Sequence, residues 1–151
     1  MNGVAHTIMG AYIGSMAISS MQPKIPQAAL IMGASVLGEI FPDIENVHSI
    51  VGRRVPIISS FLNFIFGHRG FLHSPLFLIV LWFGLARFQY FRPVFCAGYL
   101  GHLVQDLFTA GGIPLFFPIH KKVSLSPFNT GGIIDYVITC ILIAIMANIG
   151  G

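Results

Sequence analysis

Charge is what this 151-residue chain has least of, because only 9% of its residues are charged while 55% are hydrophobic. A soluble domain carries roughly 25% charged residues, so the composition indicates a membrane protein, with one domain over residues 1–151. The eight Lys and Arg leave a formal net charge of +3 but are scattered, without the basic stripe typical of nucleic-acid binding. We therefore expect membrane lipids, and no nucleic acid, among its partners.

Cysteine and targeting signals are also scarce. The two cysteines, Cys96 and Cys140, lie in apolar segments and form no CxxC pair, which predicts packed thiols rather than a disulfide framework. The N-terminus lacks the basic region and the small-residue cleavage site of a secretory signal. We therefore expect residues 4–20 to remain as a first membrane helix.

Apolar runs are abundant, and five of them predict an all-α, multi-pass transmembrane bundle of about five helices. They cover residues 4–20, 26–41, 75–88, 93–110 and 133–149. A spanning helix needs about 20 apolar residues, with a lower limit near 17, so the second and third runs are short. Ser74 and Pro75 are the residue types of an N-cap and a first helical position. Residues 55–66 are too few to span, and we expect them to lie on the membrane surface or over a site.

The few acidic residues lie near the histidines. Three acids precede the stretch at residues 68–74 (HRGFLHS), and Asp106 follows His102 by four positions. Successive spans alternate between the two sides of a membrane, so five spans bring one set of residues to the same face: His6, Asp43, His68, His73, His102 and Asp106. This convergence predicts a shared polar site near one membrane face. The distribution of Lys and Arg favours the cytoplasmic face.

Histidine and carboxylate together indicate a divalent metal site. Imidazole nitrogen and carboxylate oxygen bind Zn²⁺, our first expectation, or Mn²⁺, and His102 and Asp106 share one face of a helix. The candidate metal ligands are His6, Asp43, Glu45, His68, His73, His102 and Asp106. They exceed the needs of one tetrahedral ion, so one or two ions are expected, with two preferred. Paired ions activate water and hold the oxygens of a phosphoryl displacement.

The catalytic candidates are Asp43, Arg69 and Asp106. Arg69 either pairs with Glu45 or holds an anionic phosphate. Glu39, inside the second apolar run, is interpreted as a support for the ligands or as a proton carrier. His48 and His120 lie in connecting segments and are interpreted as solvated.

These residues resemble a known family, the YdjM-like, LexA-regulated, membrane-bound metal-dependent hydrolases of bacterial inner membranes. The matching pieces are residues 41–45 (FPDIE), 68–74, 101–112 (GHLVQDLFTAGG) and 129–132 (NTGG), with His6 and Thr7 before them. Glu45 stands where the family usually has a second Asp, and Leu72 where it favours Thr. The resemblance implies a multi-pass membrane protein with a divalent metal. A distant similarity to helical zinc phospholipases C suggests a phosphoester of a lipid or another amphiphile as substrate.

Three other functions remain open on the residues alone. A transporter for divalent cations or protons would use Glu39, His102 and Asp106 as a relay, but its site belongs near the middle of the bilayer. A haem protein would use His73 and His102 as axial ligands. A non-catalytic membrane protein would keep these groups as structural contacts or as a structural metal site.

Overall fold

The fold is described by a computed structural model that covers residues 1–67, 69–119, 121–127, 129 and 131–150. The α-helices are α1 (Gly3–Met21), α2 (Ile25–Ile40), α3 (Pro56–Phe66), α4 (Pro75–Gly84), α5 (Phe91–Leu107) and α6 (Ile133–Gly150). Short 3₁₀ turns connect them: η1 (Pro42–Glu45), η2 (Gly52–Arg54) and η3 (Phe71–His73). Within the described residues there is no strand beyond an isolated bridge between Ile113 and Val123. The all-α prediction is therefore confirmed.

Each of the five apolar runs forms a helix, and the ends follow local chemistry. Asn2 caps α1 by accepting a hydrogen bond from the backbone N–H of Ala5. Ser74 caps α4 in the same way by accepting from Phe77 N–H, with Pro75 as the first helical residue. The predicted helix at residues 75–88 ends early, at Gly84.

The helices of the structure do not match the predicted membrane spans. Among the described residues, no helix has both the length and the apolar character that crossing a membrane requires. Helices α2 and α4 contain only 16 and 10 residues.

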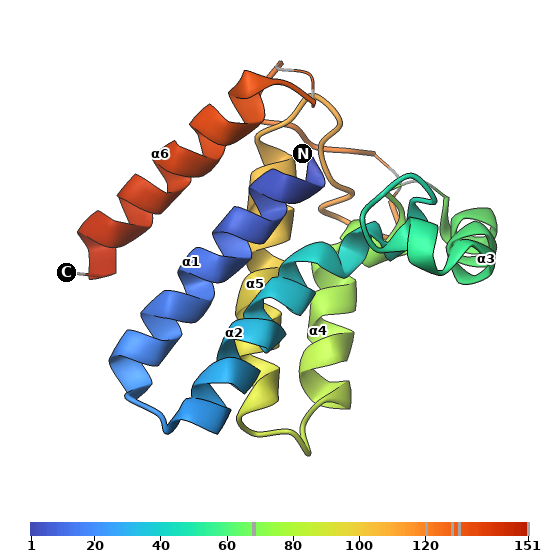
Figure 1. Cartoon of the computed structure of the whole chain (residues 1–151). Helices are drawn as coiled ribbons and strands as arrows, with labels where there is room; N and C mark the ends of the chain where they lie inside the picture. The colour runs from blue at the N-terminus through green and yellow to red at the C-terminus, as the bar shows by residue number, and fades with distance from the viewer. Residues whose placement is uncertain (68, 120, 128, 130, 151) are drawn as a thin grey trace.

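Helix α2 packs against both α1 and α5 at very short range (Figure 1). A Cβ atom added at Gly98 of α5 would lie 2.1 Å from the carbonyl oxygen of Ser35, and one at Gly38 of α2 would lie 2.0 Å from that of Phe95. On the other side, a Cβ at Gly10 would lie 2.9 Å from Cα of Val36. Glycine at these positions lets the three backbones touch.

We expect Gly38→Ala to destabilise the fold by about 1–3 kcal/mol, because the added methyl group must displace the backbone of α5. Gly33→Ala in the same helix is the matched control, since a Cβ there meets nothing within 4 Å. The control should be neutral or stabilising by up to about 1 kcal/mol. Thermal unfolding in detergent, followed by circular dichroism, measures both. Equal effects of the two substitutions would contradict the close crossing.

Candidate metal centre

Three fully buried histidines from three different elements meet beside two aspartates. His6 lies on α1, His73 ends η3 and His102 lies on α5. Asp43 lies on η1, and Asp106 lies one turn beyond His102 on α5. His6 is near the beginning of its helix and Asp106 near the end of its own. All five residues therefore gather at one end of the bundle.

The Nδ1 atom of each histidine is close to an oxygen atom. His102 Nδ1 lies 2.5 Å from the backbone carbonyl oxygen of Glu39, and His6 Nδ1 lies 3.4 Å from Oε1 of the same residue. His73 Nδ1 lies 3.0 Å from Oε1 of Glu45. A proton on Nδ1 that points to such an oxygen leaves Nε2 with its lone pair, which is the arrangement of histidines that bind metals.

The Nε2 atoms face one another and the aspartates. His73 Nε2 and His102 Nε2 are 3.2 Å apart, and each lies 3.6 Å from Oδ2 of Asp106. His73 Nε2 is 3.7 Å from Asp43 Oδ1, and His6 Nε2 is 3.8 Å from Asp106 Oδ1. Four ligands at about 2.0–2.1 Å from one ion, at tetrahedral angles, lie roughly 3.4 Å apart. The observed spacing therefore fits a shared ion.

Two of these atoms form no hydrogen bond with the described part of the chain. His6 Nε2 and Asp106 Oδ2 are buried, and neither has a hydrogen-bond partner among the residues that the structure describes. A buried polar atom without a partner is costly. Donor atoms within 4.8 Å of one another form two candidate groups, His6–Asp43–His102 and His73–His102–Asp106. The donor set and the unpaired atoms thus agree with a divalent cation.

The electrostatics of the two connecting turns match this arrangement. Burial lowers the pKa of His73, but hydrogen bonds with Asp43 and Glu45 outweigh it and raise the pKa to about 9. Burial raises the pKa of Asp43, yet the hydrogen bond with His73 and the nearby histidines bring that pKa below its usual range. The centre therefore attracts positive charge, either a proton or a metal ion.

Arg69 closes one side of the centre. Its Nη2 donates to Asp106 Oδ1 over 2.9 Å, and Nη1 donates to Oγ1 of Thr109 over 3.3 Å. Its backbone N–H donates to Oε1 of Glu45, and its φ of 54° is left-handed. Arg69 thus pairs with Asp106 rather than Glu45 through its guanidinium, which corrects one of the two expected roles.

The remaining predicted residues are placed as follows. Glu45 contacts the Nδ1 side of the His73 ring, away from the centre. Glu39 supports two histidines, which agrees with a supporting role. His68 and His120 lie outside the described residues. The amino group of Met1 also contacts Asp106 Oδ1.

One structural contributor was missed at the sequence level. The buried hydroxyl group of Tyr99 donates to the carbonyl oxygen of Leu72, the residue before His73. Tyr99 precedes His102 by three positions on α5, so this bond ties the η3 turn to the helix that carries His102. A tyrosine one turn before a candidate ligand histidine was the only available signal.

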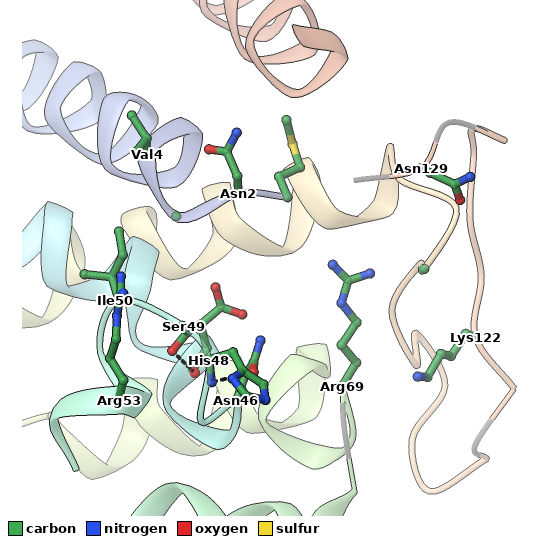
Figure 2. Close-up of a pocket in the computed structure, with 14 residues that line it drawn as sticks. Asn2, Val4, Asn46, His48, Ser49, Ile50, Arg53, Arg69, Lys122 and Asn129 are labelled. Carbon is green, nitrogen blue, oxygen red and sulfur yellow. Dashed lines mark hydrogen bonds between the residues drawn. The ribbon is translucent and has the colours of Figure 1, made fainter. Parts of the chain in front are cut away.

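A cavity of about 840 Å³ adjoins the centre. Asp43 and Arg69 line it, together with Arg53, Lys122 and His48. Figure 2 shows Arg69 between two groups of lining residues, with Lys122 on one side of it and Asn46, His48 and Ser49 on the other. The cavity therefore joins a carboxylate of the centre to a mainly basic surface.

The fold and the site define a helical-bundle protein with a buried histidine–carboxylate centre. Residues 1–150 match the family described as YdjM inner membrane protein, and the chain belongs to that family. The uncharacterized protein YvsG of Bacillus subtilis (strain 168) is 31% identical over 135 residues, covering 87% of this chain and 82% of YvsG. The inner membrane protein YdjM of Escherichia coli (strain K12) is 35% identical over 106 residues, which is 63% of this chain and 53% of YdjM. No solved structure matches the chain.

Glu45→Gln should weaken zinc binding by about 10–100-fold, because it removes the charge that orients His73 and raises its basicity. His48→Ala is the control, since His48 lines the cavity but belongs to neither candidate metal group. Competition titration with a zinc-sensitive dye compares the two proteins. Unchanged affinity in Glu45→Gln would exclude this role.

Proposed function

We propose that this protein is a divalent-metal-dependent hydrolase of the bacterial inner membrane that cleaves a phosphoester of a lipid or another amphiphile. The observation that carries the proposal is the convergence of three histidine Nε2 atoms on Asp43 and Asp106. Each Nδ1 lies beside an oxygen of Glu39 or Glu45. Four of these five ionisable side chains, those of His6, His73, His102 and Asp106, are fully buried, which favours a functional centre over incidental polar contacts.

Zn²⁺ is the ion that this donor set suits best, with Mn²⁺ as the alternative, because three imidazoles and carboxylates are typical zinc ligands. We assign His6, His73, His102, Asp43 and Asp106 as the residues that would hold it. His102 belongs to both candidate groups, and its Nδ1 is engaged by the Glu39 carbonyl oxygen. His102 can therefore serve only one ion, so we favour a single ion over two. Such an ion supplies Lewis-acid activation of water and of the ester.

The protein's own groups would bind and orient the substrate. The guanidinium of Arg69 reaches both Asp106 and the cavity, where it can donate to an anionic phosphoryl group. Arg53 and Lys122 line the same cavity. A volume of about 840 Å³ exceeds the needs of a phosphate and accommodates a headgroup. Asp43 lines the cavity as well, so a metal ion held by Asp43 would be accessible from it.

We place the protein in the bacterial inner membrane as a multi-pass bundle, with the centre toward the cytoplasmic face. Membership of the YdjM inner membrane protein family and exposed apolar side chains on α2, α4 and α6 support this placement. The gathering of the ligands at one end of the bundle favours hydrolysis over transport, since a transport site belongs near the midplane of the bilayer.

The test of this proposal measures metal and activity together in purified protein. We expect zinc by elemental analysis and hydrolysis of bis(4-nitrophenyl) phosphate or of phosphatidylglycerol vesicles. His102→Gln should lose both zinc and hydrolysis. His48→Ala should retain zinc. Zinc retained by His102→Gln would reject the assigned ligands, and stoichiometric zinc without hydrolysis of any phosphoester would support a structural metal site instead.

Arg69→Gln should separate substrate binding from metal binding. We expect zinc to remain bound while KM for the phosphoester rises about tenfold or more, because a charge-assisted donor to phosphate is lost. Arg87→Gln is the control, since Arg87 is exposed and lies in the connection between α4 and α5. Steady-state kinetics on zinc-loaded protein gives both values. An unchanged KM would remove Arg69 from the substrate site.

A further inference from the structure

Helix α3 has the reverse of the polarity found in a helix of a soluble protein. Two of its polar side chains face the protein, and the first, Ser59, is buried and donates to the carbonyl oxygen of Gly52 over 3.0 Å. Asn63 donates through Nδ2 to the carbonyl oxygen of Glu45 over 3.2 Å. Both bonds attach α3 to the turns that carry Glu45 and Arg53. The helix is therefore held to the site by its polar side.

The outward side of α3 is apolar except for the exposed Ser60. Phe64 is 89% exposed and Ile57 is 85% exposed. The exposed large hydrophobic residues of the helix are Ile57, Ile58, Phe61, Phe64 and Ile65. Their spacing puts them on one face. A contiguous apolar patch of this kind marks an interaction surface.

The position and charge of α3 indicate what covers that face. Figure 1 shows α3 projecting from the side of the bundle, at the end that carries the N-terminus and across the direction of α4 and α5. The helix contains no charged residue, and the exposed Arg53 and Arg54 immediately precede it. An apolar helix face with arginines beside it matches the boundary between acyl chains and acidic headgroups.

A second copy of the chain fits this face less well than a leaflet does. An 11-residue helix is about 16 Å long and about 10 Å wide, so one of its faces offers only a few hundred Å². A stable protein interface buries roughly 800 Å² per partner. Insertion into a leaflet has no such requirement.

We propose that α3 is an interfacial helix that buries its apolar face in the acyl boundary of the leaflet, with Arg53 and Arg54 at the depth of the headgroups. Arg53 also lines the cavity beside the metal centre. Insertion of α3 therefore holds the mouth of that cavity at headgroup depth, where an amphiphile can enter without leaving the leaflet. This inference rests on membership of an inner membrane family and does not require that the protein be a hydrolase.

Depth-dependent fluorescence quenching tests the proposal on the full chain. Trp82 is the single tryptophan, so Trp82→Phe provides a silent background. Phe61→Trp reports from the apolar face, and Ser60→Trp is the matched control on the flank of the same helix. Each protein is reconstituted in vesicles of phosphatidylethanolamine and phosphatidylglycerol, with bromine on the acyl chains near the headgroup. We expect blue-shifted emission from Phe61→Trp and about twofold more quenching than from Ser60→Trp.

Two outcomes would overturn the proposal. Emission typical of water with quenching by acrylamide would show a solvated helix. Blue-shifted emission without bromine quenching, dependent on the protein-to-lipid ratio, would show that another copy of the chain covers the face. Phe64→Trp repeats the measurement at a second exposed position in case Phe61→Trp fails to fold. Zinc content of each variant is measured in parallel, so that loss of the metal centre is distinguished from failure of α3 to insert.

Discussion

The whole centre depends on the contact between Nδ1 of each histidine and an oxygen atom. Glu39 supplies two of these oxygens, its carboxylate for His6 and its backbone carbonyl for His102, and Glu45 supplies the third for His73. Because the contact at Nδ1 fixes the orientation of each imidazole ring, its Nε2 faces the aspartates. A rotation of any one ring would turn its Nδ1 away from the neighbouring oxygen and its Nε2 away from the aspartates, so the surrounding fold must hold all three rings in place.

The glycine contacts between helices provide that rigidity. Glu39 can reach both His6 and His102 only if α1, α2 and α5 approach closely, and Gly10, Gly38 and Gly98 permit this approach. Gly38 immediately precedes Glu39, so the closest backbone contact and the supporting carboxylate are adjacent in the sequence. The close packing of these helices and the chemistry of the centre are therefore one constraint.

Much of this arrangement could be predicted from the sequence. Helices that run back and forth had to bring His6, Asp43, His73 and His102 to one end, and the spacing of His102 and Asp106 set their common face. Three features could not be predicted. The carbonyl oxygen of Glu39 carries no side-chain signal, and Glu45 lies on a 3₁₀ turn, where a residue two positions after Asp43 points in another direction. The left-handed backbone of Arg69, which aims its guanidinium at Asp106, also has no simple sequence marker.

The candidate ligands lie far apart in the sequence, from His6 on α1 to Asp106 on α5. This separation determines when the centre can form. Three α-helices and three 3₁₀ turns lie in the sequence between α1, which carries His6, and α5, which carries Asp106. Glu39 is buried at the contact of α2 with these two helices. During synthesis, His6 of α1 and Glu39 of α2 can contact each other once both helices exist, but neither can meet His102 or Asp106 until α5 has been made. Helix α5 is therefore the last element that the centre needs. A nascent chain that stops before residue 102 has the groups on α1, η1 and η3, but it lacks His102 and Asp106 and cannot complete the centre.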